Sequence, residues 1–349
     1  STRAPMASLI GVISIYGLLK SRLPWITYTA KSGYNIFGGN ARTMQKGGID
    51  LRRNDNMRID MMDWNGRALV ETEWLADHLN DPKLRIIDAS VIMTRQDDGT
   101  WMPSSGWDDY QSNHIPGAQF VDLLAELQDQ DADLSLMLPG PEAFATEISA
   151  KGIGDEHMVV VYATAVPWWA TRFWWMLKAN GHNKVAVLDG GIKKWRSEDR
   201  PTTEDIPEFS SAIFTAKQRP ELIADKSKVQ AVLGSGNGSV INALSPQLHS
   251  GKSDLGYGRP GRIAGSLNLS ALKLIDHDTG TYLPDDRLRQ AVTGDLGDLK
   301  GEAICYCGGG IAATMDALVL DLLGYSKVSV YDASLSEWAA DDQLPMETG

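Results

Sequence analysis

Cys307 is the residue whose surroundings most favour covalent chemistry in this 349-residue chain. It follows the apolar run "AICY" and precedes three glycines and a helix-like stretch of small residues, "IAATMDALVLDLL". The N–H groups and positive dipole end at the start of such a helix would face the thiol, and glycines can adopt positive φ and turn further N–H groups toward it. We therefore expect a Cys307 thiol with a lowered pKa, acting as a nucleophile. The expected cradle, which would also hold the charge of a persulfide, consists of the N–H groups of Gly308, Gly309, Gly310, Ile311 and Ala312.

Other uses of this loop fit the residues less well. A phosphate-binding loop of the Walker type would end in Lys-Ser/Thr, and a cysteine phosphatase would close its loop with an arginine, whereas Ala313 and Thr314 stand here. No local signature supports a protease-type Cys–His pair, and an inert cysteine in a tight turn is the plain alternative. Cys305, the other cysteine, lies within the apolar run and is expected to be a small buried hydrophobic residue.

An internal repeat sets out the elements that position this loop. Residues 159–195 match residues 303–338, and upstream 84–90 match 239–245 and 114–123 match 262–272. The first copy has Ala163 at the place of Cys307 and lacks the three glycines, so we expect only the second copy to be reactive. Matched pairs include Tyr162 with Tyr306, Gly181 with Gly324, Asp189 with Asp332 and Trp195 with Trp338.

Short apolar runs alternate with longer helical stretches in each copy. Runs such as "VVVY" and "VAVL" are typical of buried parallel strands, and "WWATRFWWMLKANG" is typical of a helix that ends at glycine. This alternation predicts an α/β fold with two similar domains, each a mainly parallel sheet with helices on both faces. The expected divisions are a basic leader or extension at 1–56 that is not part of the fold, a first domain at 68–200, a linker at 201–225 and a second domain at 226–349.

Composition limits the partners and the compartment. The net charge is −12 although residues 1–56 carry six more basic than acidic residues, so the rest is strongly acidic, which argues against nucleic acid as a partner. Two cysteines two residues apart make no disulfide framework, which favours a reducing compartment such as the cytoplasm. The leader's apolar run, residues 7–19, is too short for stable membrane insertion; mitochondrial targeting or export is the alternative if it is a targeting segment. Six histidines without paired spacing give no reason to expect a metal.

Several motifs together make the chain similar to a known family. They are "HIPGA", "FWWMLKANGH", "VAVLDGGIKKW", "YCGGGIAA" and "YSKVSVYDASLSEW". Over about residues 68–349 the chain resembles the tandem-domain rhodaneses, the thiosulfate and 3-mercaptopyruvate sulfurtransferases. The resemblance implies two rhodanese-like domains, a catalytic cysteine only in the second, a persulfide intermediate, no cofactor, and an active site between the domains.

The resemblance also implies roles for particular residues. Cys307 takes the place of the nucleophile. Arg172 stands where the family has an arginine that reaches toward the carboxylate or sulfonate of the donor, and Lys178 occupies a second such position. Arg259 and Arg262 lie on a segment expected near the active-site face of the second domain, where they could add positive charge.

Some positions depart from the family pattern. The loop carries no basic residue after the cysteine, which favours the mercaptopyruvate type, yet Gly309 stands where that type commonly has serine. Asn242 and Leu244 replace a common Asp and Arg. Asp88 and His114 match motif residues and are candidates for a supporting role, although a histidine that opens "HIPG" more often has a structural role.

These observations lead to one functional hypothesis and one alternative. The hypothesis is a sulfurtransferase that takes sulfane sulfur from a small anion, thiosulfate or 3-mercaptopyruvate, onto Cys307 and passes it to cyanide, a small thiol or thioredoxin. The alternative is a non-catalytic rhodanese-like protein that binds a partner or carries a persulfide.

Overall fold

The structure is a computed structural model that describes residues 64–97, 101–254, 256–299 and 301–349. The leader expected at residues 1–56 lies outside the described residues, and so do the predictions that concern it. Within the described ranges no helix is both long and apolar enough to cross a membrane.

The first half of the described chain is built on a five-stranded sheet in which every neighbouring pair is parallel. Its central strands are apolar and buried on both faces, as expected for parallel strands covered on each side. In spatial order the strands are β1 (Leu69–Val70), β7 (Val185–Leu188), β6 (Met158–Tyr162), β2 (Leu84–Asp88) and β5 (Ala118–Phe120).

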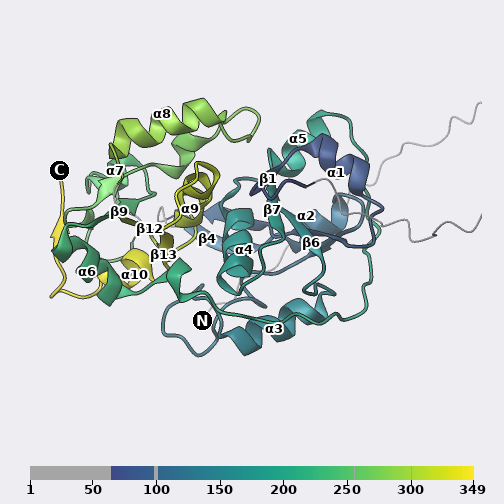
Figure 1. The fold of residues 1–349 in the computed structure, drawn as a ribbon, viewed down its shortest axis with the longest axis horizontal. Helices are drawn as coiled ribbons and strands as arrows, with labels where there is room; N and C mark the ends of the chain where they lie inside the picture. The colour runs from purple at the N-terminus through teal and green to yellow at the C-terminus, as the bar shows by residue number, and fades with distance from the viewer. Residues whose placement is uncertain (1–63, 98–100, 255, 300) are drawn as a thin grey trace, which may run out of the picture. The chain divides into compact units, whose positions relative to one another are not determined.

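The second half repeats this sheet with the same order and direction (Figure 1). The predicted α/β fold with two similar parallel-sheet units is therefore confirmed. One detail differs, because residues 220–224, expected in the linker, form a short 3₁₀ helix and an edge strand of this sheet. The strands in order are β8 (Ile223–Ala224), β13 (Val328–Tyr331), β12 (Glu302–Tyr306), β9 (Gly238–Asn242) and β11 (Leu267–Asn268).

Helices cover both faces of each sheet. Alternate residues of β6 show this directly, since Val159 and Val161 belong to one buried cluster while Val160 and Tyr162 belong to another. The helices of the first half are α1 (Thr72–His78), α2 (Trp107–Ser112), α3 (Pro141–Ala150), α4 (Trp168–Ala179) and α5 (Gly191–Ser197). Those of the second half are α6 (Lys226–Ser235), α7 (Pro246–His249), α8 (Asp285–Leu296), α9 (Ala313–Leu322) and α10 (Ser334–Trp338), with 3₁₀ helices η1 (Pro220–Leu222) and η2 (Ala271–Leu274).

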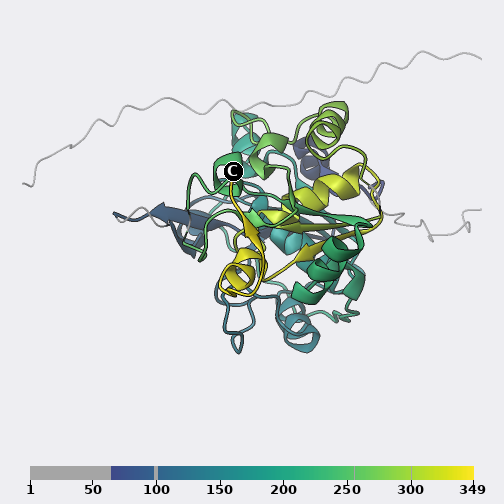
Figure 2. The same cartoon turned by 90° about the vertical axis from the view of Figure 1, so that its left-hand side faces the viewer.

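Two pairs of antiparallel strands lie outside the five-stranded sheets. One is a hairpin in the first half, drawn in blue at the left of Figure 2, and the other joins the C-terminal segment to the second half. Their strands are β3 (Val91–Arg95) with β4 (Trp101–Ser105), and β10 (Arg262–Ile263) with β14 (Met346–Glu347).

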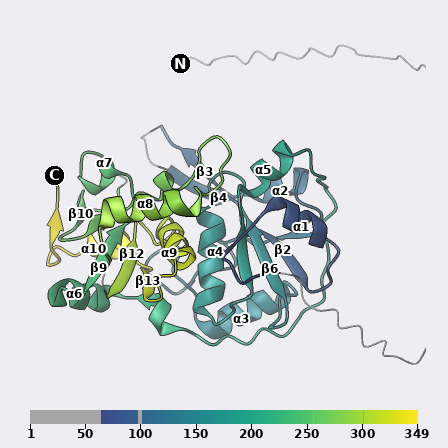
Figure 3. The same ribbon diagram turned by 45° about the horizontal axis from the view of Figure 1, so that its top comes forward.

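Helices α4 and α9 hold the two halves together and lie side by side (Figure 3). The hydroxyl groups of Thr171 and Thr314, which are equivalent residues of the repeat, share a hydrogen bond of 2.7 Å. Lys178 and Asp321 are also equivalent, and their charged groups lie 3.9 Å apart. Contacts between equivalent residues are typical of a two-fold arrangement. The two helices therefore start at the same end, which brings the first half to the Cys307 loop.

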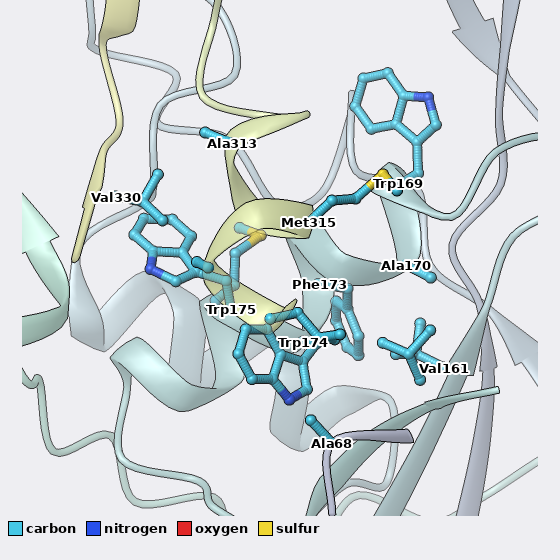
Figure 4. Packing of buried hydrophobic residues seen from close by; sticks show 14 of the residues in the cluster. Ala68, Val161, Trp169, Ala170, Phe173, Trp174, Trp175, Ala313, Met315 and Val330 are labelled. Atoms are coloured by element: carbon cyan, nitrogen blue, oxygen red, sulfur yellow. The ribbon is translucent and has the colours of Figure 1, made fainter. Parts of the chain in front are cut away.

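Aromatic residues fill this junction. Phe173, Trp174 and Trp175 of α4 and Met315 of α9 belong to one buried cluster that draws on both halves of the chain (Figure 4). Burying an aromatic side chain removes a large apolar area from water, which stabilises the contact between the halves.

Asp316 is the exception within this core. Its side chain is fully buried, and neither carboxylate oxygen has a hydrogen-bond partner. The equivalent residue in the first copy is Phe173. Burial raises the pKa of the Asp316 carboxyl well above its usual range, so the group is held in its neutral form.

We predict that Asp316→Leu stabilises the protein at pH 8 by about 1–3 kcal/mol, the usual cost of an unsatisfied buried polar group. In the unfolded chain the Asp316 carboxyl ionises at about pH 4, whereas in the folded protein it keeps its proton. The free energy of unfolding of the wild type therefore falls as the pH rises above about 4. The gain should therefore shrink at pH 4. Urea unfolding midpoints at both pH values measure this, with Asp321→Asn on the exposed side of the same helix as the control. A variant less stable than wild type at pH 8 would show that Asp316 has a stabilising partner.

Candidate active site

Cys307 lies directly after β12, on the face of the second sheet that α9 covers. Its exposed fraction is 3%, and it belongs to the same buried cluster as Cys305, two residues earlier on the strand. The backbone N–H of Cys307 donates to Ser334 Oγ at 3.0 Å. Cys305 is fully buried within β12, as predicted for a residue of the core.

Four backbone N–H groups converge on the sulfur of Cys307, but burial has the larger effect on its pKa. Desolvation raises the pKa of the thiol, while hydrogen bonds from the N–H groups of Ala313, Gly309, Gly310 and Ile311 lower it by less. The expected net lowering of the pKa is therefore wrong for the free thiol. Gly309, Gly310 and Ile311 belong to the expected cradle, and Ala313 is an additional donor beyond it.

The N–H groups of the loop point inward because its carbonyl groups are held on the outer side. The N–H of Leu335 donates to the carbonyl of Cys307 at 3.2 Å. The N–H and hydroxyl of Ser336 both donate to the carbonyl of Gly308, at 2.9 and 3.0 Å. These donors belong to the first turn of α10, whose N–H groups have no partner within their own helix. The start of α10 thus orients the start of the cysteine loop.

Two of the three glycines occupy places where a side chain would not fit. Gly310 alone has a positive φ, +77°, and a Cβ there would lie 2.3 Å from the carbonyl oxygen of Asp332. A Cβ on Gly308 would lie 2.2 Å from the ring of Tyr257, which covers the loop. A Cβ on Gly309 would meet only the hydroxyl of Ser336, at 3.6 Å. The expected positive φ is therefore confirmed for Gly310 only.

Tyr257 and Ser334 are site residues that the sequence analysis did not identify. Burial, and then the nearby Cys307, raises the pKa of Tyr257 to about 12, so its ring is a neutral wall of the site. Ser334 has φ +49°, where the first copy has Gly191 with φ +54°. The serine keeps this unfavourable backbone conformation while its hydroxyl accepts from the N–H of Cys307. The replacement of Gly191 in the first copy by Ser334 in the second was the feature of the sequence that could have identified Ser334 as a site residue.

Arg172 reaches the cysteine loop from the first half of the chain. Its exposed fraction is 2%, and its guanidinium forms a close ion pair with Asp332. Nη1 also donates to the carbonyl of Gly310 at 3.3 Å, and Nη2 to the carbonyl of Leu136 at 2.5 Å. The structure brings Arg172 to the site, but with these contacts to protein oxygen atoms in place of the open position expected of a donor anchor.

The other three candidate cations do not gather at the loop. Lys178 lies about 9 Å farther along α4 than Arg172, beside Asp321. Arg259 donates to four backbone carbonyls at and beyond the end of α10. Arg262 binds Glu347 and the carbonyl of Gly349. In the structure each of these three cations therefore contacts other protein groups, and their expected contact with a bound donor stays a prediction.

Asp88 and His114 lie within the first half and support its own loops. Asp88 accepts from the N–H of Ser90, and burial raises the pKa of its carboxyl. His114 is fully buried, stacks on Tyr110 and bonds the carbonyls of Tyr110 and Asp205. In the described part of the chain, no hydrogen bond or ion pair joins either residue to the cysteine loop.

We searched the described residues for side chains that could bind a metal ion together. Over the residues that the structure describes, no group of three or more His, Cys, Asp or Glu side chains is arranged to hold a metal ion.

Comparison with known proteins places this arrangement in a family. The model of the rhodanese-like domain matches residues 71–198 and 239–341. The chain is 32% identical over 282 residues to 3-mercaptopyruvate sulfurtransferase of Escherichia coli (strain K12), which covers 80% of this chain and 97% of that protein. It is also 32% identical over 293 residues to thiosulfate sulfurtransferase of Cricetulus griseus, covering 81% and 94%.

A solved structure agrees with these relatives. The crystal structure of SseA from Escherichia coli, described as a 3-mercaptopyruvate sulfotransferase with the rhodanese fold, superposes with a TM-score of 0.69 at 30% identity. The match covers 77% of this chain and 98% of that chain. The protein belongs to the rhodanese family, with two rhodanese-like domains.

We predict that Gly310→Ala lowers activity about 100-fold, because a side chain at this positive φ would push the loop away from Asp332 and misplace the N–H groups. Gly309→Ala should leave activity nearly unchanged, since its Cβ has room. Sulfur transfer to cyanide measures both variants. Equal loss in the two variants would show that the loop does not depend on the conformation of Gly310.

Proposed function

We propose that Cys307 carries the transferred sulfur as a persulfide in a double-displacement reaction. The protein is a sulfurtransferase, in line with its family and its relatives. The observation that carries the proposal is the convergence of four backbone N–H groups on one cysteine sulfur. Fixed donors of this kind stabilise a thiolate or a persulfide anion without having to reorganise.

The chemistry follows in two steps. The Cys307 thiolate attacks the terminal sulfur of the donor, and the bond from that sulfur to the rest of the donor breaks. The electron pair leaves with sulfite when the donor is thiosulfate, or with the enolate of pyruvate, which then takes a proton, when the donor is 3-mercaptopyruvate. In the second step a nucleophilic acceptor attacks the outer sulfur of the persulfide, and Cys307 departs as a thiolate held by the N–H cradle.

The proposed donors are thiosulfate and 3-mercaptopyruvate, the donors named for the two relatives. Both are anions, and the N–H cradle offers them positive partial charge at the reacting sulfur. The proposed acceptors are cyanide, a small thiol or thioredoxin. The proposed location is a reducing compartment, the cytoplasm, because an oxidised Cys307 could not attack a donor. Mitochondrial targeting or export is the alternative if residues 1–56 are a targeting leader.

Cys307→Ser is expected to abolish sulfur transfer from both donors to cyanide, because a serine hydroxyl cannot form the persulfide. Cys305→Ser is the matched control, since Cys305 lies inside the strand, and it should retain activity if the variant folds. Kinetics with both donors and mass spectrometry of the persulfide on intact protein are the measurements. Turnover by Cys307→Ser would end the proposal, and a persulfide without turnover would favour the alternative of a persulfide carrier.

The raised thiol pKa leads to a second expectation. Burial keeps most of the Cys307 thiol protonated at neutral pH, so the thiolate fraction and the rate of donor attack should increase as pH rises above 7. Alkylation of Cys307 by iodoacetamide as a function of pH, followed by mass spectrometry, measures this directly. A rate that is already constant between pH 6 and 8 would show that the cradle outweighs desolvation.

A further inference from the structure

We propose that Arg172 and Asp332 form a positioning pair that locks the cysteine loop in its active shape, and that this is the role of Arg172 in place of donor anchoring. The inference rests on the proposed role of Cys307 as the persulfide carrier. It concerns what holds the cradle, not which residue reacts.

The contacts of the pair join three segments at the loop. Asp332, directly after β13, receives Arg172 from α4 through one carboxylate oxygen. Its other oxygen accepts from the N–H of Leu138 in the first half at 2.8 Å. Arg172 meanwhile donates to the carbonyl of Gly310. The buried Arg172–Asp332 pair thus connects the cysteine loop and the end of β13 to the first half of the chain.

Gly310 is the residue through which the Arg172–Asp332 pair contacts the N–H cradle. Its N–H is one of those directed at the sulfur of Cys307, and its carbonyl is the group that Arg172 holds. Its Cα lies so close to Asp332 that a Cβ would meet both the backbone and the carboxylate oxygens of that residue. A shift of the ion pair would therefore rotate the peptide units that carry the N–H donors.

Backbone strain on the other side of the pair supports the same role. Leu136, whose carbonyl accepts from Arg172, has φ +66°. Leu136 and Ser334 are two of the three non-glycine residues with positive φ in the described ranges. Non-glycine residues persist in that region only where surrounding contacts hold them, and such residues cluster at functional sites.

The repeat provides an internal comparison. Asp189 is the equivalent of Asp332, and it too accepts from a backbone N–H of the opposite half, that of Tyr282, at 2.8 Å. The equivalent of Arg172 is Met315, so this aspartate has no arginine, and burial raises its pKa to about 6. The charged pair is therefore present only beside the copy that has the cysteine.

Electrostatics argue against a donor anchor. The charge of Arg172 is already balanced by a carboxylate in direct contact, and the neighbouring oxygen atoms belong to backbone carbonyls. An anionic donor at this place would have to displace Asp332 and would be repelled by it. Truncating one partner of a buried pair, by contrast, leaves an uncompensated charge under the loop.

The test compares Arg172→Met, Arg172→Lys, Asp332→Asn and the double variant Arg172→Met/Asp332→Asn. Lys151→Met, which removes an ion pair with Glu126 inside the first half, is the control for loss of a salt bridge alone. The measurements are kcat and KM for thiosulfate and 3-mercaptopyruvate, and the pH dependence of iodoacetamide alkylation of Cys307. Circular dichroism and thermal melting identify variants that are folded, and the nearly isosteric Asp332→Asn provides the test if Arg172→Met is not.

A positioning pair predicts that Arg172→Met and Asp332→Asn both lower kcat about 100-fold with KM nearly unchanged, and both shift the alkylation profile to higher pH. Arg172→Lys should rescue part of kcat, and the double variant should be no worse than the single ones because both remove one interaction. The proposal is overturned if Arg172→Met raises KM for both donors while Asp332→Asn leaves kcat and the alkylation profile as in wild type. Wild-type protein that forms no persulfide on Cys307 would instead refute the proposed function.

Discussion

The fixed orientation of the peptide units after Cys307 is the constraint on which the site depends. A peptide N–H and its carbonyl point in opposite directions, so N–H groups can converge on a sulfur only if the carbonyls are satisfied elsewhere. Here N–H groups of the first turn of α10 donate to the carbonyls of Cys307 and Gly308, and Arg172 donates to the carbonyl of Gly310. The loop begins at the end of a strand of the sheet, and the contacts with α10 and Arg172 determine which way its peptide units point.

The two copies of the repeat show what the fold requires and what the chemistry adds. Both have the parallel sheet in the same strand order, the helix after the central strand and the aspartate that binds the other half. Only the second has the thiol, the glycines, the hydroxyl of Ser334 and the arginine partner of Asp332. The thiol, the glycines and Ser334 belong to the second half, whereas the arginine, Arg172, comes from the first half and contacts the loop at Gly310.

Patterns within the sequence predicted the fold class, the repeat, the buried place of Cys305 and the loop that presents Cys307, because strand runs and glycines are local signals. They could not predict contacts between distant residues. Whether Arg172 faces a donor or Asp332, and whether Arg259 faces the loop or the end of α10, depends on packing between segments far apart in the chain. The raised pKa of Cys307 was not predicted either, because the burial that outweighs the nearby N–H groups results from tertiary packing.

The hydrogen bond between Thr171 and Thr314 has a consequence for how the active site is maintained. A contact between equivalent residues is what a symmetric homodimer makes, and here the two partners are covalently joined. In a dimer of separate chains, dilution would take away the half that supports the cysteine loop. In a single chain the effective concentration of that half is set by the connecting segment, so the assembled site does not depend on how much protein is present.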